Sequence, residues 1–154
     1  MSFLNASGLN SRDKKKFHGG RARPYREQYL TGFDGSLAGK RCLVLDDEFL
    51  IALDIQNILE VAGAVVTCVA DADEALTQLG GSKRFDLAII DVMLGNMVTS
   101  TAVTGRLIEL GIPFVFLTGM RSDDVNLRHP GVPVVEKPYV AEVLLRAAGM
   151  ALIP

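Results

Sequence analysis

A chain of 154 residues has the length of one domain and can bury a full hydrophobic core. Hydrophobic residues make up 49% of it, charged residues 22%, and the formal net charge is -2, so nothing in the composition points to nucleic acid or a membrane as the main partner. The first thirty residues hold no apolar block that could serve as a signal peptide, and no run reaches the roughly 18 apolar residues of a membrane span.

The N-terminal segment differs from the rest in charge. Residues 1–38 carry seven Lys/Arg against three Asp/Glu, a net charge of +4 that leaves -6 for the remainder. This segment is rich in Gly, Ser and Asn and has no sustained periodicity, apart from a possible short helix near 24–30. We expect a flexible basic tail over 1–38, which could touch phosphate or an acidic surface, and a folded domain over 39–154.

Strands and helices alternate from residue 41 onward. The apolar patterns predict strands over 41–45, 64–70, 85–91, 112–119 and 132–138, and helices over 50–62, 71–79, 99–110 and 140–150. Asp71 is expected to cap the second helix, and one face of the first is expected to carry its apolar residues, Leu50, Ile51, Leu53, Ile55, Ile58 and Leu59. This alternation is typical of an α/β domain with a mostly parallel, doubly wound sheet and helices on both faces. Residues 120–132 show no apolar period and contain Pro130 and Gly131, so a loop with at most one turn, capped by Ser122, replaces the fourth helix.

Both cysteines, Cys42 and Cys68, lie in predicted strands. We therefore expect buried, reduced thiols and a cytoplasmic protein.

Polar side chains follow the predicted strands where each strand ends. Asp46 and Asp47 follow the first strand, Asp91 ends the third, Thr118 the fourth, and Lys137 follows the fifth. The carboxyl ends of parallel strands open onto one crevice, where three carboxylates would repel each other unless a cation neutralised them. Oxygen ligands without His or Cys indicate Mg²⁺ rather than zinc or copper.

A carboxylate beside such a metal can act as a nucleophile on phosphorus. We assign Asp46 and Asp47 to the metal and Asp91 to the nucleophile. Lys137 would supply the ammonium that holds phosphoryl oxygens, and Thr118 a hydrogen bond to one of them.

The segments "LVLDDE", "LAIIDVML", "FVFLTG" and "VVEKPY", in this order, resemble the receiver domain of two-component response regulators over about residues 39–152. The resemblance implies a flavodoxin-like, five-stranded parallel sheet of order 2-1-3-4-5. It also implies that Asp46, Asp47, Asp91 and the backbone carbonyl of Met93 bind Mg²⁺, and that Asp91 accepts phosphate from a histidine kinase. The peptide bond between Lys137 and the following proline is expected to be cis.

"PFVFLTG" is similar to the P-F-x-F-A-T-G signature of a sub-group of stand-alone receivers, with Leu117 in place of the alanine. Val134 occupies the position where many receivers carry a switching aromatic residue; Tyr139 is either its substitute or a lid over the core. In the family, Met93 and Met120 would flank the path of the hydrolytic water. Neither can orient a water, so we expect slow loss of the phosphoryl group.

These features predict a phosphoacceptor switch rather than an enzyme. We expect no output domain, and so no DNA-binding domain, after the last predicted helix, and therefore output through a downstream protein or a phosphotransfer protein in a phosphorelay. Alternatives are the C-terminal receiver of a hybrid histidine kinase, since "SLAGKR" resembles its linker, and a receiver-like module without phosphorylation. A Mg²⁺-dependent phosphatase is a further alternative, although neither Asp46 nor Asp91 has the second acid that it would need two residues later. Glu48 is expected to cap the first helix, with a metal role as the alternative.

Overall fold

The structure is a computed structural model that describes residues 37–95, 97–98, 101–119, 125–126 and 128–154. Nearly all of the basic tail, the short helix near 24–30, Met120 and the turn at Ser122 lie outside the described residues. Strands and helices alternate along the rest: β1 (Arg41–Leu45), α2 (Phe49–Val61), β2 (Val65–Val69), α3 (Ala72–Gly80), β3 (Leu87–Asp91), β4 (Met93–Leu94), β5 (Met97–Val98), α4 (Thr101–Glu109), β6 (Phe114–Thr118), β7 (Val134–Glu136) and α6 (Ala141–Leu152).

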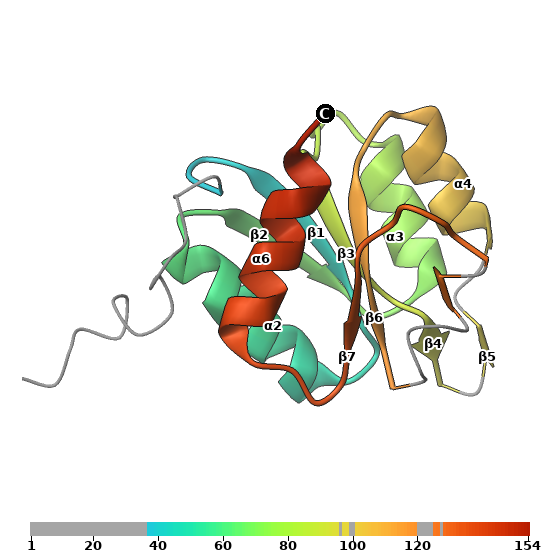
Figure 1. Ribbon diagram of the computed structural model, residues 1–154. Helices are drawn as coiled ribbons and strands as arrows, with labels where there is room; N and C mark the ends of the chain where they lie inside the picture. The colour runs from blue at the N-terminus through green and yellow to red at the C-terminus, as the bar shows by residue number, and fades with distance from the viewer. Residues whose placement is uncertain (1–36, 96, 99–100, 120–124, 127) are drawn as a thin grey trace, which may run out of the picture.

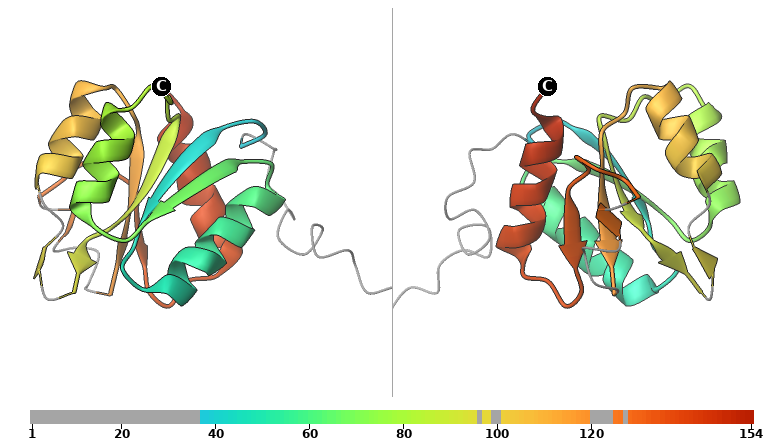
Figure 2. Two further views of the ribbon diagram at one scale, coloured as in Figure 1. Left: turned by 180° about the vertical axis from the view of Figure 1, so that it is seen from behind. Right: turned by 45° about the vertical axis from the view of Figure 1, so that its right-hand side comes forward.

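Five parallel strands form one sheet in the order β2-β1-β3-β6-β7. Counted within this sheet, the order is 2-1-3-4-5, so the predicted flavodoxin-like topology is confirmed. Figures 1 and 2 show α2 and α6 covering one face and α3 and α4 the other. The register pairs Asp91 with Leu117 and Thr118 with Glu136, which brings the carboxyl ends of the central strands to one edge.

Alternate residues of each central strand enter two separate cores. Cys42 and Val44 of β1 pack against α2 and α6, whereas Leu43 and Leu45 pack against α3 and α4. Because both faces of the sheet are covered, these strands are continuously apolar. Each such buried side chain stabilises the fold by roughly 1.5–3 kcal/mol relative to an exposed one.

Helix α2 buries a narrower stripe than its sequence predicts. Ile55, Ile58 and Leu59, at helical spacing, lie in the core. Leu50 and Leu53 were expected on the same face, but they are 76% and 40% exposed. That part of the prediction is wrong because Leu50 and Leu53 lie on the side of α2 that is turned away from the core, whereas Ile51 and Ala52 of the same turn pack toward it.

The start of α3 is fixed as predicted. The Asp71 carboxylate accepts the Glu74 N–H at 2.8 Å, and the Glu74 carboxylate accepts the Ala70 N–H at 2.9 Å. These reciprocal bonds satisfy backbone donors that the first helical turn leaves unpaired.

Two segments near the carboxyl edge complete the fold. Between β3 and α4 lies an antiparallel pair, β4 and β5, of two residues each, which was not predicted. Between β6 and β7, Val125 and Asn126 are helical, and the Val125 carbonyl accepts the N–H groups of Arg128 and His129. Among the described residues of this segment, helix is confined to these two, which fits the short fourth helix that was expected.

The two cysteines have different environments. Cys42 is buried, and burial, together with the Asp86 carboxylate, raises the pKa of its thiol to about 12. Cys68 is exposed, contrary to the prediction, because β2 lies at the edge of the sheet. Both thiols are free. Within the described residues no helix is long and apolar enough to span a membrane.

Candidate functional site

Three charged side chains from separate strand ends meet at the carboxyl edge of the sheet. The ammonium of Lys137, just after β7, lies 3.0 Å from an oxygen of Asp46 and 3.0 Å from an oxygen of Asp91. Asp46 follows β1 and Asp91 ends β3, and the two residues are only 2% and 3% exposed. The peptide bond after Lys137 is cis, as expected. The sequence prediction that these three residues converge is confirmed.

Burial and charge act in opposite directions on Asp91. Burial, the largest effect, raises the pKa of this carboxyl. The Met93 N–H donates to Asp91 Oδ1 at 2.9 Å and lowers the pKa, and so does Lys137. The charge of Asp46 raises it again. The net result is a raised pKa. Burial lowers the pKa of Lys137, but its bonds to Asp91 and Asp46 outweigh that effect and raise it. The ammonium therefore stays charged beside two carboxylates.

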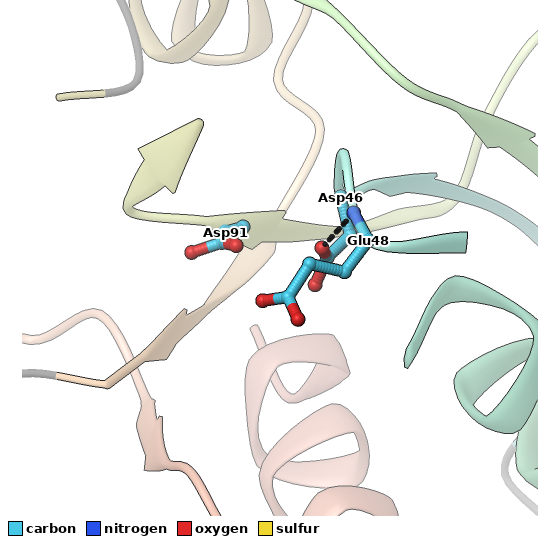
Figure 3. A group of neighbouring side chains, drawn as sticks. All are labelled: Asp46, Glu48 and Asp91. Carbon is cyan, nitrogen blue, oxygen red and sulfur yellow. Dashed lines mark hydrogen bonds between the residues drawn. The ribbon is translucent and has the colours of Figure 1, made fainter. Parts of the chain in front are cut away.

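Glu48 adds a third carboxylate to this group. It is the N-cap residue of α2, as predicted, but its side chain makes no capping bond. Instead it lies 3.8 Å from the Lys137 ammonium, while Asp46 accepts the Glu48 N–H at 2.9 Å (Figure 3). Carboxylate oxygens of Asp46, Glu48 and Asp91 lie within 4.8 Å of one another. A metal role for Glu48 was only the alternative prediction, because an acid at a helix start is usually a cap.

Asp47 takes a different position from Asp46. Its exposed carboxylate accepts the backbone N–H of Gly95, 2.8 Å away, at the turn between β4 and β5. It lies at the mouth of a pocket of about 410 Å³ that Asp91, Met93 and Lys137 also line. The two neighbouring acids therefore serve different parts of the site, one at its buried base and one at its rim.

Thr118 is fully buried at the end of β6. Its carbonyl accepts the Lys137 N–H at 2.7 Å, and the next residue, Gly119, lines the pocket. Thr118 thus fixes the backbone that carries Lys137.

The donor set fits a divalent cation. Asp46, Glu48 and Asp91 carry three negative charges against the single positive charge of Lys137, and Asp47 adds a fourth at the rim. Clustered carboxylates of this kind raise one another's pKa unless a cation neutralises them. Among the described residues that line the pocket there is no His or Cys, so hard cations such as Mg²⁺ suit it better than zinc.

Two curated proteins resemble the chain in sequence. A probable histidine kinase 5 of Oryza sativa subsp. japonica is 31% identical over 102 residues, which are 64% of this chain and 9% of that protein. The uncharacterized transcriptional regulatory protein YbdJ of Bacillus subtilis (strain 168) is 30% identical over 118 residues, 74% of this chain and 52% of that protein. The chain thus spans about half of the length of the second curated relative and less than a tenth of the length of the first. No protein-family model matches it.

Solved structures share the fold over most of their length. A response regulator receiver protein from Sinorhizobium medicae WSM419 aligns with a TM-score of 0.68 and 25% identity, over 76% of this chain and 97% of that one. SdrG from Sphingomonas melonis Fr1 aligns with a TM-score of 0.62 and 31% identity, over 75% of this chain and 98% of that one. A response regulator from Burkholderia pseudomallei, solved with a phosphorylated aspartic acid and a calcium ion, aligns with a TM-score of 0.61 and 26% identity, over 71% of this chain and 66% of that one. The sheet order, the charged cluster at the strand ends and these likenesses show that the chain contains a receiver domain of the two-component response-regulator type.

Proposed function

We propose that Asp91 is the phosphoacceptor of a response regulator and receives its phosphoryl group from a phosphohistidine of a histidine kinase. The observation that carries this proposal is the position of the Lys137 ammonium, 3.0 Å from Asp91 and 3.0 Å from Asp46. An ammonium held there can neutralise the oxygens of an arriving phosphoryl group. A carboxylate oxygen of Asp91 would form the new O–P bond while the P–N bond of the phosphohistidine breaks and the imidazole leaves.

Mg²⁺ is the metal we propose for this site, held by Asp46, Asp47, Asp91 and the backbone carbonyl of Met93. It would neutralise charge on the phosphoryl oxygens during transfer. Glu48 lies near enough to Asp46 and Asp91 to contribute directly or through a water. Lys137 would move toward the phosphoryl group, and Thr118 would then donate a hydrogen bond to one of the phosphoryl oxygens. The response regulator from Burkholderia pseudomallei, solved with a phosphorylated aspartic acid and a calcium ion, supports the combination of an acceptor aspartate with a divalent cation.

The surface beside the pocket favours a protein partner. Near the start of α2, Phe49 is 75% and Leu50 76% exposed, and near the start of α6, Val140 is 63% and Val143 46% exposed. Large apolar side chains that gather on a surface in this way mark interaction sites. We propose that the histidine kinase docks here, and that output passes through a downstream protein or a phosphotransfer protein in a phosphorelay.

A receiver within a hybrid histidine kinase is a second candidate. The match to the rice histidine kinase covers 64% of this chain but 9% of that protein, as a receiver module within a long kinase would. Assignment to the P-F-x-F-A-T-G sub-group and a cytoplasmic location remain predictions. The phosphoacceptor chemistry would be the same in all these settings.

The decisive experiment is incubation with acetyl phosphate and Mg²⁺ followed by measurement of intact mass. Wild type should gain one phosphoryl group and Asp91→Asn none. Asp73→Asn, which removes the same charge from the exposed first turn of α3, is the matched control and should be phosphorylated normally. The same mass gain in wild type and Asp91→Asn would defeat the proposal, and continued turnover of a generic phosphomonoester would favour a phosphatase instead.

A further inference from the structure

A second cavity lies at the opposite, amino edge of the sheet. Its volume is about 240 Å³, it is partly open to solvent, and it is lined by the end of α3, the loop that leads into β3 and the last turn of α4. Phe85 and Ile112 precede β3 and β6, so this cavity and Asp91 lie at opposite ends of β3. Figure 2 shows α3 and α4 side by side on the same face of the sheet. The proposed phosphotransfer makes no use of this cavity.

Positive charge dominates its wall. Lys83, Arg84 and Arg106 line it, and among the described residues no carboxylate does. Arg106 pairs with Glu109 at 3.1 Å, whereas Lys83 and Arg84 have no ion pair within the described part of the chain.

The cations exceed the negative charge available to balance them. The carboxyl ends of α3 and α4 lie beside the cavity, and each contributes about -0.5 of an elementary charge. With Glu109 and these two helix ends counted against the three cations, about one positive charge remains.

The rest of the lining is apolar. Leu79 and Phe85 are 5% and 7% exposed, and Leu110 and Ile112 complete the wall. A water occupies about 30 Å³ of liquid, so 240 Å³ has room for roughly eight waters or a small organic molecule. A pocket with positive charge on one side and apolar surface on the other suits a ligand that has both an anionic group and an apolar part.

We propose that this cavity binds a small anion, a carboxylate or phosphate group carried on an apolar body. Lys83 and Arg84 would contact the anion, and Leu79 and Phe85 the apolar part. Such a group occurs on a free small molecule and at the C-terminus of a peptide with an apolar last residue. A ligand of about ten non-hydrogen atoms binds with a Kd near the millimolar range.

The test is a titration of the full ¹⁵N-labelled chain, at low salt, with phenyl phosphate as probe and benzyl alcohol as its uncharged counterpart. Phenyl phosphate should give saturable shifts of the amides of Gly80, Gly81 and Arg84. A double variant, Lys83→Gln with Arg84→Gln, should weaken binding by about tenfold or more. The control double variant, Arg128→Gln with Arg146→Gln, removes the same charge elsewhere and should leave the affinity unchanged.

Two further arms separate the sources of the ligand and the two sites. A tetrapeptide ending in phenylalanine, with a free or an amidated C-terminus, shows whether a peptide carboxylate binds more tightly than phenyl phosphate. Asp91→Asn should bind phenyl phosphate like wild type, so failure of the proposed phosphotransfer would leave this result intact. Absence of saturable shifts, equal weakening by both double variants, or equal binding of benzyl alcohol would overturn the proposal.

Discussion

The backbone N–H of Gly95 donates a hydrogen bond to the carboxylate of Asp47, 2.8 Å away, and so ties the turn after β4 to the end of β1. Gly95 has a φ of 59°, which favours glycine because other residues are strained there. A carboxylate oriented by a backbone donor is well prepared to ligate a cation with its other oxygen.

Asp47→Asn tests this role. The amide oxygen can still accept the Gly95 N–H, but the negative charge is lost, so Mg²⁺ affinity should fall by about tenfold or more. Stability without metal should change by no more than about 0.5 kcal/mol because Asp47 is exposed. Calorimetric Mg²⁺ titration measures the affinity, with Asp73→Asn as the control. Unchanged affinity in Asp47→Asn would remove Asp47 from the metal site.

Asp91→Asn should stabilise the metal-free protein at neutral pH. The pKa of Asp91 is raised in the folded state, chiefly by burial. The charged carboxylate therefore lowers the free energy of unfolding once the pH exceeds the pKa of an ordinary aspartate. Stability from this group is complete at low pH and lost as pH rises through its folded pKa. The gain from Asp91→Asn should therefore disappear in acid.

Urea unfolding with and without Mg²⁺ checks the prediction on Asp91. Mg²⁺ should stabilise wild type, because it binds the folded state, and should stabilise Asp91→Asn much less. Equal Mg²⁺ stabilisation of the two proteins would show that the cation binds elsewhere.

Lys137→Met should destabilise the protein at pH 7 by about 2–4 kcal/mol, because two buried carboxylates lose their common partner. The side chains of Asp46 and Asp91 are 0% and 4% exposed, so water cannot replace the ammonium easily. The loss should be smaller in acid, and Mg²⁺ should restore part of it. Arg146→Met breaks the exposed pair with Glu142 and should cost about 0.5 kcal/mol or less by the same urea unfolding. A similar loss in both variants would argue against a special role for Lys137.

Tyr139 resembles a lid more than a free switch. Its partly buried ring packs against the core between α2 and α6, and its hydroxyl donates to Asp54 at 3.0 Å. Tyr139→Phe should cost about 0.5–1.5 kcal/mol. Burial, followed by Asp54, raises the pKa of Tyr139, so its stabilising effect is present below the ordinary tyrosine pKa of 10.0 and lost as pH rises through the folded value. Unfolding of wild type and Tyr139→Phe at neutral and alkaline pH tests this, and a constant difference would contradict it.

The sequence predicts the strand ends well because the central strands are apolar throughout and end abruptly in Asp46 and Asp91. It does not predict β4 and β5, since two-residue strands are too short to show a period. Nor could it show that Leu50 and Cys68 are exposed, because the first depends on which side of α2 faces the sheet and the second on which strand lies at the edge of the sheet. The separate positions of Asp46 and Asp47 likewise depend on Gly95, which lies 48 residues from Asp47 in the chain.

The phosphoryl group on Asp91 should be lost slowly. Hydrolysis needs a water held in line with the phosphorus, and Met93, which lines the pocket two residues after Asp91, has no side-chain group that orients a water. Met93→Gln supplies an amide there and should speed hydrolysis severalfold, while Met93→Leu, of similar size and equally apolar, should not. Decay of the phosphorylated mass after removal of acetyl phosphate, in the presence of Mg²⁺, measures the rate. A wild-type half-life of seconds, or equal rates in the two variants, would show that water reaches the phosphoryl group by a path that Met93 does not control.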